Sequence, residues 1–338
     1  MAIDAKQSVS GSIYNGEMVW LHMSNNLVSI IIPSFNSQEW VCDAIDSSLQ
    51  QTYAHCEVIV VDDGSTDNTR ELLQQKYGNR IKYIYQENRG LAGARNTGVR
   101  NASGDYLQFL DADDEITPDK IEKQVKILEQ HKEYTVAFSD FEYFEGGASN
   151  ITKLSPETFR KKYQTGNLWK PFLTGNFIVV HAALARKADV VAVGCFDESI
   201  WACEDYDLWM RLAGRGCNFV YTNGIMARYR LTPGSMSSAR IMQIRGTIYV
   251  LLKNISEFGL NDEGDKSSAR NYIASLHTAL GELYCSEGHP IKSIVHCFRA
   301  VHFAPWQWPN ISKVLLNNLH FRAMLSKIIR NKRFGVDH

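Results

Sequence analysis

The segments VIVVDD at 58–63 and YLQFLDADD at 106–114 decide the fold of this chain. Each begins with a largely apolar run, which is typical of a strand covered on both faces in a parallel sheet. Each ends in acidic residues, and ligands of such sheets bind at the carboxyl ends of the strands. Five carboxylates that meet there repel one another unless a cation joins them, so the sequence predicts a divalent metal holding a diphosphate. These carboxylates belong to Asp62, Asp63, Asp111, Asp113 and Asp114.

Strand and helix alternate from residue 27 to residue 131, an order that implies a doubly wound α/β sheet, mixed but mainly parallel, flanked by helices. The predicted strands lie at 27–33, 57–63, 81–86 and 105–111, and the predicted helices around 40–49, 72–73, 91–102 and 118–131. Isolated strands are then predicted at 135–140, 176–180 and 218–222, with one helix from Glu204 to about Arg215. The long connections between them are expected to build a binding site for a second substrate.

Only helices are predicted beyond residue 239, at 239–258, 267–286, 290–303 and 311–329. One stretch carries Gly281, Tyr284, Ala300 and Pro305 at the spacing of a tetratricopeptide hairpin, but three copies are normally needed for a solenoid. The first 26 residues are polar and are expected to form a flexible tail.

Composition excludes several classes of protein. The 338 residues carry a net charge of −1, without the basic excess of a nucleic-acid binder. Seven cysteines show no CxxC pair, so we expect neither zinc nor disulfides but reduced core residues of a cytoplasmic protein. No apolar run approaches the roughly 18 residues of a membrane span.

The segment VDDGSTDNT at 61–69 leaves a strand and turns at Gly64. Helix capping would explain Gly64 and Asp67, but it would not explain two further carboxylates at the strand end. We therefore predict that Asp63 accepts hydrogen bonds from a uracil-type N–H or a ribose hydroxyl. Pro33, Ser34 and Phe35, which leave the first strand, are expected to supply the neighbouring wall for the base.

Asp111 and Asp113 are predicted to share one Mg²⁺ or Mn²⁺, because alternate side chains at a strand end point to the same side. Asp114 would then point elsewhere, towards a helix cap. Arg95, at the start of a helix with small residues, is predicted either to neutralise Asp63 or to hold a phosphate.

Glu204 and Asp205 precede a helix, where the dipole favours acids, so capping is one interpretation. Their aromatic neighbours favour another, because partial burial raises a carboxylate pKa and makes it a stronger base. These neighbours are Trp201, Tyr206 and Trp209.

Taken together, six segments resemble the family 2 glycosyltransferases, inverting enzymes with the GT-A fold, over about residues 27–238. They are VSIIIPSFN, VIVVDDGSTDNT, QENRGLAGARNTG, DYLQFLDADDEITPDK, GCFDESIWACEDYDLWMRL and ARYRLTPGS. The resemblance implies that Asp63 contacts the donor base, Asp111 the ribose or metal and Asp113 the metal, with Asp205 as catalytic base. It also implies a nucleotide-binding half at 27–115 and an acceptor half at 116–238, followed by a helical region at 239–338.

One departure from the family pattern concerns the metal. Many members carry a His two residues after the Arg of the YR segment, whereas this chain has Thr232 after Arg230. A third protein ligand is then missing, and metal binding would depend more on the donor. Arg230 and Ser235 remain as phosphate contacts from a loop that closes over the donor.

The predicted function is metal-dependent transfer of a sugar from a nucleotide diphosphate, UDP favoured, to a hydroxyl of a glycan or lipid-linked acceptor in polysaccharide biosynthesis. A non-catalytic nucleotide-sugar binding module is the alternative; a sugar nucleotidyltransferase fits less well, because 33–40 is not the Gly-, Arg- and Lys-bearing loop it needs. The basic C-terminal segment 321–338 is either a solvated helix end or a peripheral contact with the inner face of the membrane.

Overall fold

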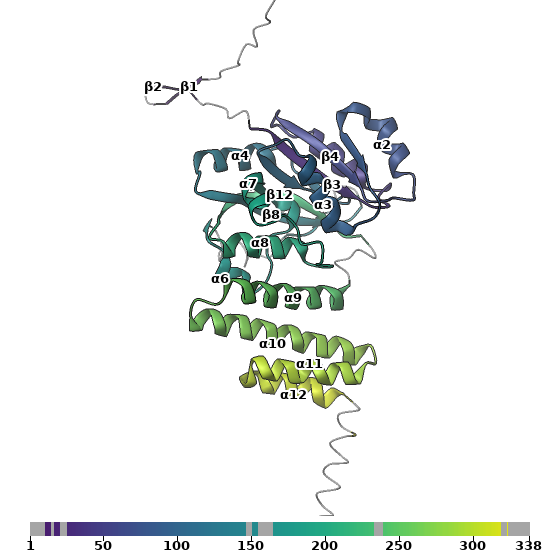
Figure 1. The fold of residues 1–338 in the computed structure, drawn as a ribbon, viewed down its shortest axis with the longest axis vertical. Coiled ribbons are helices and arrows are strands. Elements are labelled where there is room, and N and C mark those ends of the chain that lie inside the picture. The colour runs from purple at the N-terminus through teal and green to yellow at the C-terminus, as the bar shows by residue number, and fades with distance from the viewer. Residues whose placement is uncertain are drawn as a thin grey trace, which may run out of the picture.

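The described part of the chain, in a computed structural model, comprises residues 11–14, 17–20, 26–146, 151–154, 165–232, 239–318 and 323. A ten-stranded mixed sheet forms its centre, in the order β10-β12-β8-β11-β6-β3-β4-β5, with β7 beside β12 and β9 beside β8 (Figure 1).

The first half confirms the predicted strand and helix alternation. Its strands run parallel and its helices lie between them in sequence. These elements are β3 (Val28–Ser34), α1 (Val41–Leu49), β4 (Cys56–Asp62), α2 (Thr69–Tyr77), η1 (Gly78–Arg80), β5 (Lys82–Tyr85), α3 (Gly90–Asn101) and β6 (Tyr106–Phe109).

Each face of the sheet has its own core, as expected of a doubly wound fold. Ile30 and Ile32 of β3 pack with α1, while Ile31 faces α3 and α8 (Glu204–Gly214). Helix α3 lies so close to β3 that a Cβ at Gly98 would stand 2.3 Å from Ile31 Cγ2. Only glycine therefore fits at Gly98 without moving the helix.

The second half is irregular. It contains β7 (Glu115–Ile116), α4 (Lys120–Gln130), β8 (Tyr134–Phe144), β9 (Ile151–Leu154), β10 (Thr165–Gly166), α6 (Trp169–Phe172), η2 (Val180–Ala182), β11 (Ala183–Arg186), α7 (Lys187–Ala192), α8 and β12 (Asn218–Arg230). Strand β11 is antiparallel to both β6 and β8, which makes the sheet mixed.

The strand predicted at 176–180 is wrong, because the strand of this region is β11 and begins at Ala183. The apolar residues there fill the core instead: Ile178 is 1% exposed, and its carbonyl accepts a hydrogen bond from Trp209 Nε1 at 3.1 Å rather than from a neighbouring strand. A short apolar run does not by itself distinguish these outcomes.

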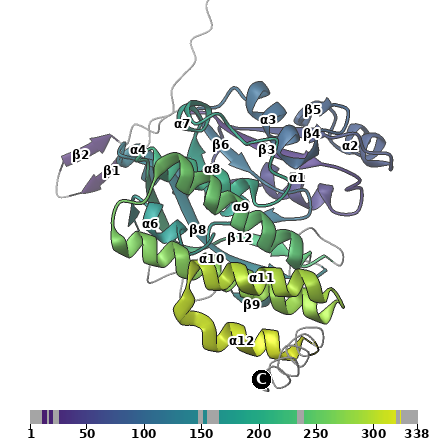
Figure 2. The same ribbon diagram turned by 60° about the horizontal axis from the view of Figure 1, so that its bottom comes forward.

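The C-terminal helices form successive layers: the first packs against α8, and each of the others packs against the helix before it (Figures 1 and 2). They are α9 (Arg240–Phe258), α10 (Glu263–Ser286), α11 (Pro290–Phe303), η4 (Pro305–Gln307) and α12 (Trp308–Asn317). Val250 and Leu251 of α9 and Ile273 of α10 belong to the same buried cluster as α3 and α8. The helical region is thus built onto the sheet domain through a shared core.

At the N-terminus, β1 (Gly11–Tyr14) pairs antiparallel with β2 (Glu17–Trp20), within the segment predicted to be a tail. The predicted helix at 311–329 is present as α12 up to Asn317. The basic segment 321–338 lies, apart from residue 323, outside the described residues. In the helices that are described, none combines the length and apolar character needed to cross a membrane.

Candidate functional site

The carboxylates at the end of β4 have different surroundings. Asp62 is fully buried and accepts hydrogen bonds from the Ser65 backbone at 2.8 Å and from Tyr83 Oη at 2.5 Å. It therefore shapes the turn after β4. Asp63, 3% exposed, accepts bonds from Gln86 Nε2 at 2.6 Å and from the Arg89 backbone at 2.9 Å. Both of these bonds end on Oδ1.

The three residues predicted to line the base lie at the end of the neighbouring strand β3 and just beyond it. Pro33 is buried within β3, which pairs with β4, and the Ser34 carbonyl accepts the Asp63 N–H at 2.8 Å. Phe35 exposes half of its surface (51%), although it is a large apolar side chain. The structure thus brings Asp63, Pro33 and Phe35 together at one sheet edge.

The acidic segment 111–114 forms a turn rather than a continuation of β6. The strand ends at Phe109, and the Asp114 N–H donates to the Asp111 carbonyl at 3.1 Å. The turn brings Asp111 and Asp114 to the same side, which replaces the alternation assumed for an extended strand. Asp113 instead faces Thr232, whose Oγ1 donates to its Oδ2 at 3.2 Å.

Asp114 does not cap a helix, contrary to prediction. It is 2% exposed and accepts the Arg230 N–H at 2.7 Å, while α4 has Asp119 at its N-cap position. Burial and the neighbouring Asp113 and Asp111 raise its pKa well above the usual range. The turn after β6 points Asp114 inward, towards residues that follow β8 in the sequence.

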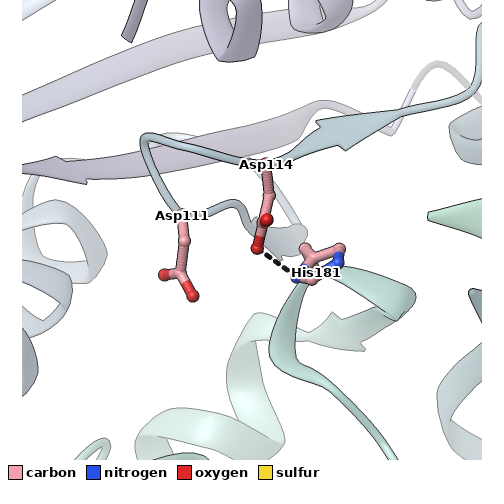
Figure 3. A group of neighbouring side chains, drawn as sticks. All are labelled: Asp111, Asp114 and His181. Atoms are coloured by element: carbon pink, nitrogen blue, oxygen red, sulfur yellow. Dashed lines mark ion pairs between the residues drawn. The ribbon is translucent and has the colours of Figure 1, made fainter. Parts of the chain in front are cut away.

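His181, on η2, is the partner of Asp114 that the sequence analysis missed. Its Nδ1 lies 3.1 Å from Asp114 Oδ2, and ligand atoms of Asp111, Asp114 and His181 fall within 4.8 Å of one another (Figure 3). Neither ring nitrogen forms a hydrogen bond with a described residue, and the side chain is fully buried. Burial lowers the pKa of His181 to about 4, so the imidazole is neutral. A lone His in an apolar run gave no signal of this contact.

Arg95 joins the two halves of the domain. Its guanidinium, 2% exposed, reaches Asp111 Oδ1 and Glu204 Oε1 at 2.5 Å each, and it lies over the Phe196 ring. The predicted pairing with Asp63 is wrong, because α3 aims Arg95 at the end of β6 and the start of α8. A buried cation between two carboxylates fixes the distance between the turn after β6 and helix α8.

Asp205 stands at the start of α8 next to this ion-pair network. The preceding Cys203 has φ 65°, a left-handed conformation that is uncommon outside glycine. Asp205 accepts the Tyr206 N–H at 2.7 Å and a hydrogen bond from Asn176 Nδ2 at 3.2 Å; it lies in the first turn of α8, whose N-cap residue Cys203 makes no side-chain capping bond. Burial and the adjacent Glu204 raise the pKa of Asp205 to about 7. A carboxyl with this pKa exchanges protons near neutral pH.

The structure places Arg230 behind the acidic turn, at the end of β12. It is 1% exposed, its Nε donates to the Asp113 carbonyl at 2.7 Å, and Nη2 pairs with Asp43 at 2.8 Å. The guanidinium carbon lies over two aromatic rings, 4.3 Å from the ring centroid of Trp40 and 4.4 Å from that of Phe144. Arg230 was predicted to contact a phosphate from a loop that closes over the donor. In the structure it is the last residue of strand β12 and not part of a loop. Ser235 lies outside the described residues.

Comparisons with known proteins agree on the family. The model described as glycosyl transferase family 2 matches residues 29–190. The Escherichia coli UDP-Glc:alpha-D-GlcNAc-diphosphoundecaprenol beta-1,3-glucosyltransferase WfgD is 31% identical over 225 residues, covering 66% of this chain and 84% of the relative. Another relative, an uncharacterized glycosyltransferase of Rickettsia conorii, is 35% identical, but the chain spans only 32% of its length.

Solved structures match the fold over most of the chain. S. aureus TarS 1–349 in complex with UDP-GlcNAc has a TM-score of 0.65 at 16% identity, covering 90% of this chain and 92% of the TarS 1–349 chain. The mannosyltransferase PcManGT from Pyrobaculum calidifontis, in complex with GDP-Man and Mn²⁺, has a TM-score of 0.61 at 17% identity, covering 91% and 81%. With the GT-A arrangement of sheet and helices and the similarity to WfgD, the chain belongs to glycosyl transferase family 2.

Proposed function

We propose that the protein is an inverting glycosyltransferase that moves a sugar from a nucleotide diphosphate, UDP favoured, to an acceptor hydroxyl. The observation that carries the proposal is Asp205, a carboxyl whose pKa is raised to about 7 and which neighbours the Glu204–Arg95–Asp111 ion-pair network. The network connects helix α8, which carries the proposed base, to the acidic turn. It thereby fixes the position of the base relative to the proposed site of the donor diphosphate.

The donor base is assigned to Asp63 and Phe35. The two hydrogen bonds to Asp63 end on Oδ1, which leaves Oδ2 for a uracil N–H or a ribose hydroxyl. The exposed Phe35 ring offers an apolar face for the base. UDP as nucleotide is supported by WfgD, named for UDP-Glc, and by TarS, solved with UDP-GlcNAc.

The acidic turn fits a divalent metal. Burial and the charge of Asp111 raise the pKa of Asp113, and the pKa of Asp114 is raised in the same way, so negative charge at the turn exceeds what nearby cations neutralise. A hard dication relieves this excess and prefers carboxylate oxygens. PcManGT, solved with Mn²⁺, supports Mn²⁺ or Mg²⁺ here.

We assign the metal to Asp113 and Asp111, because both are partly exposed and a diphosphate can share the ion with them. Asp114 and His181 are 2% and 0% exposed, so we assign them to supporting the turn from below. The bound ion would supply positive charge against the oxygens of the departing nucleoside diphosphate. Arg230, which holds the Asp113 carbonyl from behind, keeps the turn in place.

The reaction needs one proton acceptor. Asp205 takes the proton of the acceptor hydroxyl as its oxygen attacks the anomeric carbon, and a single displacement inverts the configuration there. Glu204, bound to Arg95, lies beside it and helps to raise the Asp205 pKa. The acceptor proposed is a glycan or lipid-linked glycan at the inner face of the membrane, supported by the diphosphoundecaprenol in the name of WfgD.

The variants Asp113→Asn and Asp205→Asn test the proposal because they should fail differently. Loss of the metal ligand should weaken binding of UDP with Mn²⁺, measured by calorimetry, and high Mn²⁺ should restore part of it. Loss of the base should leave that affinity nearly intact and reduce sugar transfer by about 10²- to 10⁴-fold.

The control is Asp119→Asn, a half-exposed carboxyl at the N-cap position of α4 whose partners among the described residues are Lys123 and Thr117. It should change neither quantity. Transfer is followed with a panel of nucleotide sugars and Mn²⁺. Equal loss of UDP affinity in both site variants would overturn the assignment, and UDP binding without any transfer or donor hydrolysis would favour the binding-module alternative.

A further inference from the structure

An open cavity of about 690 Å³ lies beside the loop that leads into α8. Its walls come from this loop, from the first turns of α9 and from the last turn of α10, on both sides of the boundary between the sheet domain and the helical region. The residues that matter below are Trp201, Arg240, Arg245 and Glu287.

The cavity is held close to the proposed base. Trp201 precedes Asp205 by four residues, so no more than about 14 Å of extended chain separates them. Helix α9 is packed tightly on the segment between: a Cβ at Gly246 would stand 2.8 Å from the Ala202 carbonyl oxygen. Cys203 Sγ lies 3.2 Å from Gln243 Oε1 on the same helix. These contacts fix the wall that α9 supplies relative to the start of α8.

The cavity contains unbalanced positive charge. Arg240 and Arg245 are exposed, and neither guanidinium forms an ion pair with a residue in the described ranges. Glu287 is the single acid among the lining residues. Burial, and after it the charges of Arg299 and Arg245, lower the pKa of His296 to about 4.

The start of α9 adds to this field. Ala239, Arg240, Ile241 and Met242 line the cavity, and this 19-residue helix has neither a side-chain cap nor an acid in its first turn. The first backbone N–H groups of α9 carry the positive end of the helix dipole. Phosphate groups bind where such N–H groups and arginine forks converge.

Trp201 gives the cavity an amphipathic wall. It is 48% exposed, and the guanidinium of Arg245 lies 5.7 Å from its ring centroid. Trp side chains are enriched at binding interfaces, because the ring offers an apolar face and the indole N–H a hydrogen-bond donor. Trp201 thus contacts Arg245 and lies four residues from Asp205 in the sequence, so its ring could pack against a sugar that connects an anionic group to the attacking hydroxyl.

We propose that this cavity binds a phosphate or diphosphate group of the acceptor, so that the enzyme acts on phosphate-bearing acceptors. The inference rests on the proposed function and names the acceptor class for it. Two guanidinium groups against one carboxylate leave an excess of positive charge that an anionic phosphoryl group reduces, while the positive end of α9 and the negative end of α10 offset each other. The phosphoryl group is either that of a lipid-linked diphosphate or one carried by a glycan.

The test uses the full chain in metal-free buffer, in which the acidic turn repels anions. Calorimetry with inorganic pyrophosphate should show binding to the wild type that is at least tenfold weaker in the Arg240→Met/Arg245→Met variant. Arg245→Lys, which keeps the charge, should lose less. Arg270→Met on the exposed side of α10 is the matched control and should bind like the wild type. Thermal melting verifies that each variant is folded.

Farnesyl diphosphate and glucose 1-phosphate separate the two sources. Much tighter binding of the former indicates a lipid-linked acceptor, and equal or tighter binding of the latter indicates a glycan phosphate. Pyrophosphate affinity that is absent in the wild type, or equally reduced by Arg270→Met, overturns the inference. Failure of the proposed function would be seen separately, as a wild type that binds pyrophosphate but neither binds UDP with Mn²⁺ nor transfers sugar.

Discussion

Asp205 should reduce the stability of the fold that holds it, and the substitution Asp205→Asn should therefore stabilise the protein above neutral pH. Its pKa is about 7 in the folded protein, against an ordinary 3.8. Each pKa difference of one corresponds to about 1.4 kcal/mol, so ionised Asp205 costs the folded state at most about 4 kcal/mol, and about 2 kcal/mol after allowing for its partial exposure.

The sign follows from the raised pKa. The folded state holds the proton more tightly than the unfolded chain, so the cost is absent below about pH 4, develops as the pH rises and is complete above pH 7. Asparagine has the same shape and can still accept the Tyr206 N–H. The stability gap between variant and wild type should thus widen by about 1–3 kcal/mol from pH 5 to pH 8.

Urea unfolding of both proteins at pH 5 and pH 8 measures this gap, and comparing the two proteins cancels most other titrating groups. Asp197→Asn is the control of opposite sign. Although burial opposes it, Lys253 and Ser199 lower the pKa of Asp197 to about 2. Its stabilising effect is complete above about pH 4, so this variant should lose about 1–2 kcal/mol equally at both pH values. A gap for Asp205→Asn that does not change with pH would refute the reasoning.

Three further outcomes are expected. The transfer rate at saturating donor should rise with pH through about 7 and then level off, since Asp205 must be ionised to accept a proton; a flat profile from pH 5.5 to 9 would contradict its role as base. Arg95→Met should lower the free energy of unfolding by about 3–5 kcal/mol, because it leaves the buried Glu204 and the partly buried Asp111 unpaired, and Arg95→Lys should lose less in the same urea assay. In calorimetry without nucleotide, the wild type should bind Mn²⁺ weakly, and UDP should increase its affinity for Mn²⁺. Thr232→His, which places an imidazole beside Asp113, should bind Mn²⁺ more tightly than the wild type without nucleotide. Tight Mn²⁺ binding by the wild type in the absence of nucleotide would argue against a missing ligand.

The sequence by itself determined the sheet and the position of its acids. Strands such as β3 and β4 are buried on both faces and are therefore apolar along their length. Such a run can be identified as a strand from the sequence without knowing which strands lie beside it. Asp63 follows β4 and Asp111 follows β6, and parallel pairing brings such ends to one edge. The helix at Glu204 was likewise predicted from its local pattern, and the segment order identified the family.

Tertiary structure alone decided which side chains meet at that edge. Arg95 bridges Asp111 and Glu204, residues 16 and 109 positions away, and the sequence offers no rule for choosing them over Asp63. His181 joins Asp114 only because η2 is carried beneath the turn, and Arg230 lies behind it because β12 extends to that residue. Local propensity and periodicity act over a few residues, whereas an ion pair forms between whatever charges the packed core brings within about 4 Å. The pKa of Asp205 therefore belongs to the assembled site, since both its burial and its neighbours exist only there.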